Sequence, residues 1–130
     1  MRTTLLTVLL SACLLLAARS ATAHHSFAAE FDINKPVTLT GVLTKMDWVN
    51  PHGRMHVDVT AADGTVEHWS IQTGGPTQLL RRGIGKNDFP AGIEVTIKGY
   101  RARTDSTIAH GESVTLKDGR NFFIGEIPIT

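Results

Sequence analysis

The sequence predicts an all-β, mainly antiparallel fold: a small OB-like barrel of five strands with one short helix between strands three and four. Three observations lead to this prediction. From residue 37 onward, short stretches rich in β-branched residues alternate with Gly, Pro, Asn and Asp turns. One helical pattern follows the third stretch, and the first stretch is long enough to curl around a barrel. An SH3-like barrel or an open β-sandwich fits almost equally well.

The first 23 residues have the features of a cleavable signal peptide. Arg2 supplies a basic start, residues 5–18 form an apolar run, and Ala21-Thr22-Ala23 is a pattern that signal peptidase cleaves. We therefore expect a periplasmic or secreted protein, cut after Ala23, with no transmembrane span after cleavage. Attachment of a lipid at Cys13 is the less favoured alternative, because apolar residues continue beyond it.

Cleavage would leave a mature chain of 107 residues, with an extended N-terminal segment over 24–36 and the barrel over 37–130. This mature chain has no cysteine, so its stability would depend on packing without a disulfide. Its 11 basic and 12 acidic residues give a formal charge of −1 with neutral histidines. Charge therefore offers no support for nucleic-acid binding.

The first predicted strand, residues 37–49, changes its apolar parity along its length. Val37 and Leu39 share one parity, whereas Val42, Met46 and Trp48 share the other. A bulge or bend near Gly41 would place all of them on one face.

The next two stretches are expected to form a hairpin within residues 54–71. A three-residue loop with Gly64 in the left-handed conformation pairs Val57 with Trp69 and keeps the apolar side chains together. A two-residue loop would instead pair Asp58 with Trp69, so the longer loop is preferred. The polar side chains of the hairpin then face each other on its outer side: His56 opposite Ser70, and Asp58 opposite His68.

A short helix is predicted over residues 74–83, with Pro76 suited to its first position and Gly83 to its C-terminal stop. The remaining β stretches are expected around a turn at residues 117–120: 93–102, 107–116 and 121–125. This order places the helix between the third and fourth strands.

Four motifs occur along the chain in the order "HHSFAAEFD", "WVNPH", "LLRRG" and "VTLKDGR". With them, the chain resembles a family of small exported bacterial proteins that is catalogued only as a domain of unknown function. The resemblance implies an exported β domain and assigns no activity or ligand. The positions that match the family's pattern are His24, His25, Trp48, Asn50, Pro51, His52, Trp69, Arg81, Arg82 and Gly83. The chain departs from the pattern at Arg54-Met55 and at Ile84, and His56, His68 and His110 fall outside it.

All six histidines lie after Ala23, and imidazole is the commonest protein ligand for transition metals. A mature N-terminal His24 would offer its free amine and its Nδ1 as a chelate, to which His25 and His52 could add imidazoles. Cu(II) prefers such a nitrogen-rich, tetragonal set. A copper ion at His24, His25 and His52 is therefore the best specific prediction. The competing interpretation is that a polar pair merely follows the cleavage site.

The loop that contains Asn50, Pro51, His52 and Arg54 is the second candidate site, because loops carry function more often than cores do. In this alternative the protein is a metal-free domain that binds a glycan, a peptide or a protein partner. The alternative is a purely structural role, in which His52 only occupies the tip of a turn.

Catalysis is not predicted, because no catalytic motif occurs in the sequence. On the outer face of the hairpin, His56, Asp58, His68 and Ser70 are read as cross-strand polar pairs and not as a triad. A copper oxidase or oxygenase would need an open coordination position and a reductant.

The remaining matching positions have structural explanations. Trp48 and Trp69 share the parity of core residues and are expected to pack inside. Arg81 and Arg82 end the predicted helix, where cations interact favourably with the helix dipole. An anion-binding role for the two arginines is the less favoured alternative.

Overall fold

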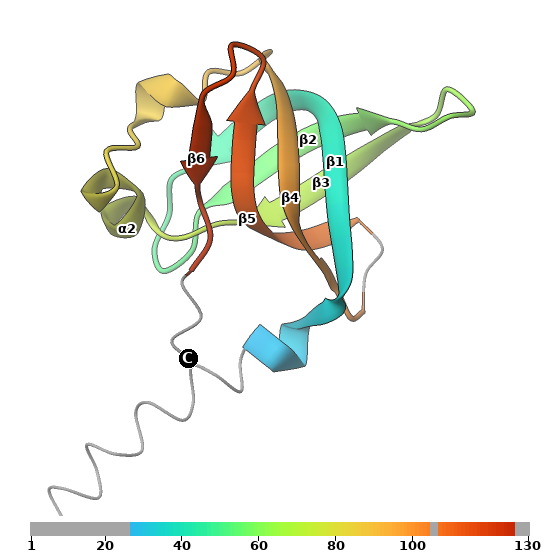
Figure 1. Ribbon diagram of the computed structural model, residues 1–130, viewed down its shortest axis with the longest axis horizontal. Helices are drawn as coiled ribbons and strands as arrows, with labels where there is room; N and C mark the ends of the chain where they lie inside the picture. The colour runs from blue at the N-terminus through green and yellow to red at the C-terminus, as the bar shows by residue number, and fades with distance from the viewer. Residues whose placement is uncertain (1–26, 105–106, 127–130) are drawn as a thin grey trace, which may run out of the picture. The chain divides into compact units, whose positions relative to one another are not determined.

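The computed structural model describes residues 27–104 and 107–126 (Figure 1). The predicted signal peptide, His24 and His25 lie outside the described residues. The chain divides into two compact units, residues 1–30 and 31–130, and the second contains the barrel. In the part of the chain that the structure describes, no helix has the length and hydropathy needed to cross a membrane.

Strands dominate the second unit, with two short helices between the third and fourth strands. The elements are β1 (Phe31–Asp47), β2 (Arg54–Thr60), β3 (Val66–Gln72), α2 (Pro76–Arg81), η1 (Lys86–Asp88), β4 (Glu94–Ala102), β5 (Ile108–Leu116) and β6 (Asn121–Phe123). The strand order is β3-β2-β1-β4-β5-β6, and a parallel pairing of β3 with β5 closes a ring of five strands. All other pairings are antiparallel, which confirms the predicted barrel class.

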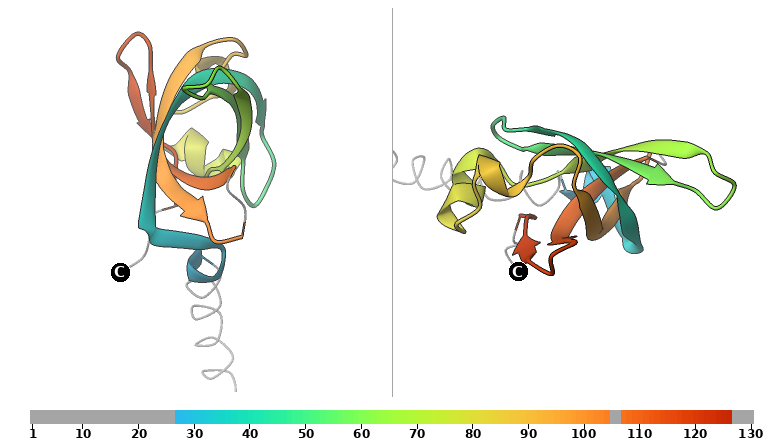
Figure 2. Two further views of the ribbon diagram at one scale, coloured as in Figure 1. Left: turned by 90° about the vertical axis from the view of Figure 1, so that its right-hand side faces the viewer. Right: turned by 90° about the horizontal axis from the view of Figure 1, so that it is seen from above.

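Two features add to the prediction. The stretch expected over 121–125 forms β6, which pairs with β5 outside the five-stranded ring through a turn in which Gly119 has a φ of 91°. The first strand begins at Phe31 and not at residue 37, so residues 31–36 of the expected N-terminal segment belong to β1. Figure 2 shows α2 across one end of the ring, while the hairpin of β2 and β3 extends from the other end.

The bulge in the first strand lies later than predicted. Between Leu43 and Lys45 the register of β1 against β2 slips by one residue, so Thr44 is the extra residue. As a result Leu43 is fully buried, while Val42, which was expected to face inward, is 43% exposed. Gly41 is not the bulge residue. A Cβ at this position would collide with the carbonyl oxygen of Asp58 in β2, so glycine permits the close approach of the two strands.

The predicted register of the hairpin is confirmed. Val57 pairs with Trp69 and Met55 with Ile71, and Gly64 has a φ of 88° at the tip. Trp69 is only 2% exposed and belongs to the core, as expected. The barrel is filled by apolar side chains from all five ring strands: Leu39, Leu43, Met55, Val57, Trp69, Ile71, Val95, Ile97, Ala109 and Val114.

The helical segment closes one end of this core. Leu79 of α2 and Ile84 after it are buried, and Gly83 has a φ of 77° directly after the helix, as the C-terminal stop requires. Beside this end, Trp48 is partly buried and stacks on Phe89 with 6.3 Å between ring centroids. The two tryptophans therefore pack as predicted, and the loop that follows Trp48 lies at the end that α2 covers.

Candidate functional site

The loop between β1 and β2 is held against the connection between β3 and α2. The Asn50–Pro51 peptide bond is cis, and a Cβ on Gly75 would overlap the carbonyl oxygen of Pro51. The N–H of Gly53 donates to Gly74 O at 3.2 Å, and the N–H of Thr73 donates to Gly53 O at 2.9 Å. Backbone contacts therefore define the position of the loop.

His52 is half-buried in this loop, and its two ring nitrogens have different surroundings. Nδ1 is buried and lies 3.1 Å from Oε1 of Glu126, an ion-pair distance, although the two groups are not in hydrogen-bond geometry. The side chain as a whole is 34% exposed. A ligand that approaches from solvent therefore cannot reach Nδ1, which leaves Nε2 as the candidate metal-binding nitrogen of this ring.

A second imidazole, His110 on β5, lies near enough to His52 for their charges to interact. His110 is 3% exposed, and its ring centroid is 5.5 Å from that of Phe31. Burial lowers the pKa of His110 from 6.5 to about 4, and the positive charge of His52 contributes in the same direction. His110 is therefore a neutral imidazole at physiological pH.

The C-terminal segment, defined as Ile124–Glu126, brings Glu126 to this end of the barrel. Ile124 is fully buried, and its carbonyl oxygen accepts a 2.7 Å hydrogen bond from the N–H of Gly74. Its own N–H donates to Glu112 O at 2.9 Å, so the segment is attached to β5 as well. Sequence reasoning missed Glu126, because no local pattern links it to His52, 74 residues earlier.

Arg82 also contacts this part of the chain. Its Nη1 donates to Gly125 O at 2.6 Å and to Phe123 O at 3.3 Å, and its guanidinium lies 4.7 Å from the Phe123 ring centroid. Within the described residues, no hydrogen bond or ion pair joins the exposed Arg81 to the same segment. One arginine of the "LLRRG" motif thus contacts Phe123 and Gly125, which the motif alone did not reveal.

Arg54, the last residue of the predicted loop site, lies apart from His52. Its Nη1 donates to Ser70 Oγ at 2.9 Å across the outer face of the hairpin. The structure therefore separates the predicted loop site into Asn50, Pro51 and His52 at the barrel end and Arg54 on the hairpin.

The two hairpin histidines each pair with a different carboxylate. His56 Nε2 lies 2.8 Å from Asp47 Oδ2, and His68 Nδ1 lies 2.6 Å from Asp58 Oδ1. Among the described residues Ser70 Oγ accepts from Arg54, and no hydrogen bond joins it to His56 or His68, so these side chains do not form a Ser-His-Asp arrangement. The pair of His68 and Asp58 is the cross-strand pair that the hairpin register predicts, whereas His56 pairs with Asp47 of β1, outside the hairpin.

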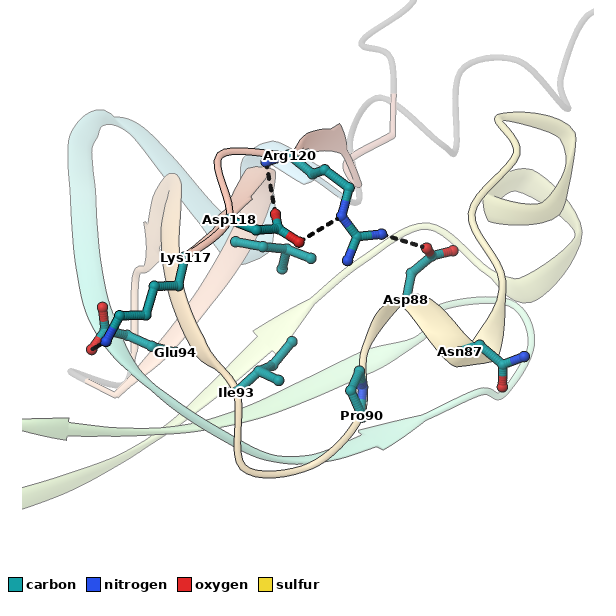
Figure 3. Close-up of a pocket in the computed structure, with 9 residues that line it drawn as sticks. Asn87, Asp88, Pro90, Ile93, Glu94, Lys117, Asp118 and Arg120 are labelled. Carbon is teal, nitrogen blue, oxygen red and sulfur yellow. Dashed lines mark hydrogen bonds and ion pairs between the residues drawn. The ribbon is translucent and has the colours of Figure 1, made fainter.

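A shallow groove of about 210 Å³ lies near η1 and the turn between β5 and β6 (Figure 3). Its charged rim is already paired: Arg120 contacts Asp118 at 2.9 Å and Asp88 at 3.2 Å, and Lys117 lies 3.9 Å from Glu94. The Arg120–Asp88 pair links the turn to η1, and the Lys117–Glu94 pair links it to β4.

Metal binding was the most specific prediction, and the described residues supply only part of it. Across residues 27–104 and 107–126, no three His, Cys, Asp or Glu side chains are grouped so that they could hold a metal ion. Of the three predicted copper ligands, His24 and His25 lie outside the described residues, and His52 is the partly exposed imidazole described above.

Comparison with known families gives one match, which extends over residues 12–112. The chain belongs to a family of unknown function (DUF6152). This confirms the family resemblance; the first three motifs lie within the matched residues, and "VTLKDGR" follows them. Comparison with curated proteins and with solved structures finds no match, and the family description names no activity or ligand.

Proposed function

We propose that this DUF6152 protein is an exported, non-catalytic module that binds Cu(II) through the His24 amine and imidazole, His25 and His52. The observation that carries the proposal is the environment of His52. Its Nδ1 is buried while the side chain remains 34% exposed, so Nε2 is the nitrogen available to a ligand. A loop fixed by backbone contacts holds this nitrogen in place, which reduces the entropy lost on metal binding.

The length of the chain supports a contribution from the N-terminal histidines. His25 precedes Phe31 by six residues, and the Phe31 ring lies against His110, the neighbour of His52. Six residues span at most roughly 20 Å. The proposed site requires this short tether to lead His24 and His25 back toward His52.

The donor set agrees with the chemistry of copper. A terminal amine and the Nδ1 of the same histidine form a chelate, and further imidazoles complete the nitrogen-rich tetragonal arrangement that Cu(II) prefers. Export followed by cleavage after Ala23 is part of the proposal, because only cleavage creates the free amine on His24.

The experiment is a Cu(II) titration, with electron paramagnetic resonance, of protein whose N-terminus has been confirmed as His24 by mass spectrometry. We expect His24→Ala, or one extra N-terminal residue, to weaken binding and change the spectrum. We expect His52→Ala to remove one nitrogen from the hyperfine pattern. His68→Ala is the matched control, because His68 also pairs with a carboxylate but is 79% exposed on the hairpin. Unchanged affinity and spectrum after the His24 change would refute the proposal.

A metal-free binding role remains the second candidate, and the exposure of the same loop favours it. Val49 is 53% exposed beside the exposed Asn50, on a loop that backbone contacts hold in place. A fixed loop with an apolar side chain next to an amide suits a glycan, peptide or protein partner. Loss of a crosslinked partner in Val49→Asp and in His52→Ala, with unchanged copper binding in Val49→Asp, would favour this role. Arg54→Ala is the control, because Arg54 faces the hairpin.

A further inference from the structure

We propose that Glu126 and Arg82 are positioning residues for His52, and that the C-terminal segment is therefore a working part of the metal site. The proposal rests on the proposed function for its consequence, which is copper affinity. Its first step concerns the tautomer of the His52 ring, which can be measured without metal.

The segment and the His52 loop share one backbone anchor, Gly74. The N–H of Gly74 donates to Ile124 O at 2.7 Å, and its carbonyl oxygen accepts from the N–H of Gly53 at 3.2 Å. Gly53 follows His52 directly, and Ile124 precedes Glu126 by two residues. The backbone next to His52 and the backbone two residues before Glu126 are thus both hydrogen-bonded to Gly74. In this arrangement Glu126 Oε1 lies 3.1 Å from His52 Nδ1.

Arg82 fixes the part of the segment that lies beyond this anchor. Its 2.6 Å hydrogen bond ends on Gly125 O, one residue before Glu126. Gly125 in turn lies directly on β5, where a Cβ would be 2.8 Å from Gly111 O. The backbone at this position is therefore held between a guanidinium and a strand, and only the Glu126 side chain extends to His52.

The chemical consequence concerns the proton of the neutral imidazole. A carboxylate 3.1 Å from Nδ1 favours the tautomer with the proton on Nδ1, because its negative charge attracts that N–H. The lone pair is then on Nε2, the ring nitrogen that remains for a metal when Nδ1 is buried. Carboxylates that orient metal-binding histidines in this way commonly contribute about 10- to 100-fold in metal affinity.

The first test uses metal-free mature protein and ¹⁵N nuclear magnetic resonance of the His52 ring. We expect the Nδ1–H tautomer in the natural protein and a shift toward Nε2–H in Glu126→Ala. Glu126 is 40% exposed, so the folded barrel should tolerate this change. Arg82→Gln should shift the ring in the same direction, and Arg82→Lys, which keeps a cation, should restore part of the natural signal.

The second test measures Cu(II) affinity in the same variants. We expect losses of about 10- to 100-fold in Glu126→Ala and smaller losses in Arg82→Gln. Arg81→Gln is the matched control, because it removes the same charge from the same helix end. It should change neither the His52 tautomer nor the Cu(II) affinity.

The outcomes separate the two proposals. If the natural protein binds no copper at its N-terminus, the proposed function fails, and the tautomer measurement still decides the positioning role. If His52→Ala weakens copper binding while Glu126→Ala and Arg82→Gln behave like Arg81→Gln in both measurements, the positioning role is wrong.

Discussion

The barrel end and the projecting hairpin each carry a histidine whose Nδ1 lies beside a carboxylate, and the two pairs differ in almost everything else. His68 and Asp58 are 2.6 Å apart, face each other across neighbouring strands, and leave His68 79% exposed. His52 and Glu126 are 3.1 Å apart, come from distant parts of the chain, and bury the nitrogen between them. The shorter distance belongs to the pair with less structural support, so distance alone does not identify a site.

The largest difference expected between the two regions is in stability. Ile124→Ala should lower the free energy of unfolding by about 2 to 5 kcal/mol, because it removes a fully buried side chain that anchors the C-terminal segment. Val66→Ala on the hairpin should cost less than about 0.5 kcal/mol, because Val66 is 50% exposed. Urea unfolding of both variants measures this. Equal losses would show that the hairpin packs as firmly as the barrel end.

The next effect is a pH dependence that only the barrel end should produce. The folded-state pKa of His110 is lowered to about 4, so its unfolded form binds a proton first as the pH falls below 6.5. Stability should therefore be full above pH 6.5 and fall between pH 6.5 and 4, by roughly 3 kcal/mol at most. Unfolding measured across this range should show a weaker pH dependence in His110→Leu. In His68→Ala the pH dependence should persist. If the natural protein, His110→Leu and His68→Ala all lose the same stability between pH 6.5 and 4, the loss belongs to other groups.

Copper affinity sharpens the comparison of the two carboxylates. Asp58→Ala should change Cu(II) affinity less than about twofold, because its histidine is not part of the proposed donor set. Glu126→Ala should lower the affinity about 10- to 100-fold, because its carboxylate favours the Nε2 lone pair of His52. The comparison fails if the two variants bind copper equally well, as measured by competition titration with a chelator of known affinity.

The smallest effect is the coupling energy of the exposed hairpin pair. A double-mutant cycle of His68→Ala and Asp58→Ala should give less than about 1 kcal/mol, because the pair is largely solvated. The coupling should shrink further in 1 M salt. Coupling that is large and independent of salt would mean that this pair is better shielded than its exposure indicates.

Local patterns predicted the hairpin well but placed the first bulge wrongly. The register of Val57 with Trp69 follows from alternation and one left-handed glycine, both of which are local. The bulge at Thr44 depends on where β1 must turn across the barrel, and two neighbouring strands decide that. Gly41 attracted the prediction because glycine often marks a bulge, but here it relieves a close contact between strands.

The candidate site was predictable only in part for the same reason. The "WVNPH" motif indicated a loop with an available histidine, and His52 is indeed partly exposed there. Nothing near Arg82 or Glu126 in the sequence indicated that they converge on one segment beside this loop. Helix-end charge explains Arg82 in a sequence, whereas its hydrogen bond to Gly125 exists only in the folded chain.

The sequence by itself determined the all-β class, the order of strands and helix, the hairpin register and the family. These depend on alternation, turn residues and motifs, which act over a few neighbouring positions. Tertiary structure alone decided which imidazole nitrogen a ligand can reach, which carboxylate lies beside it and which arginine holds that carboxylate's backbone. Each of these depends on burial and on contacts between residues about 40 to 75 positions apart, and those form only when the ring of strands closes.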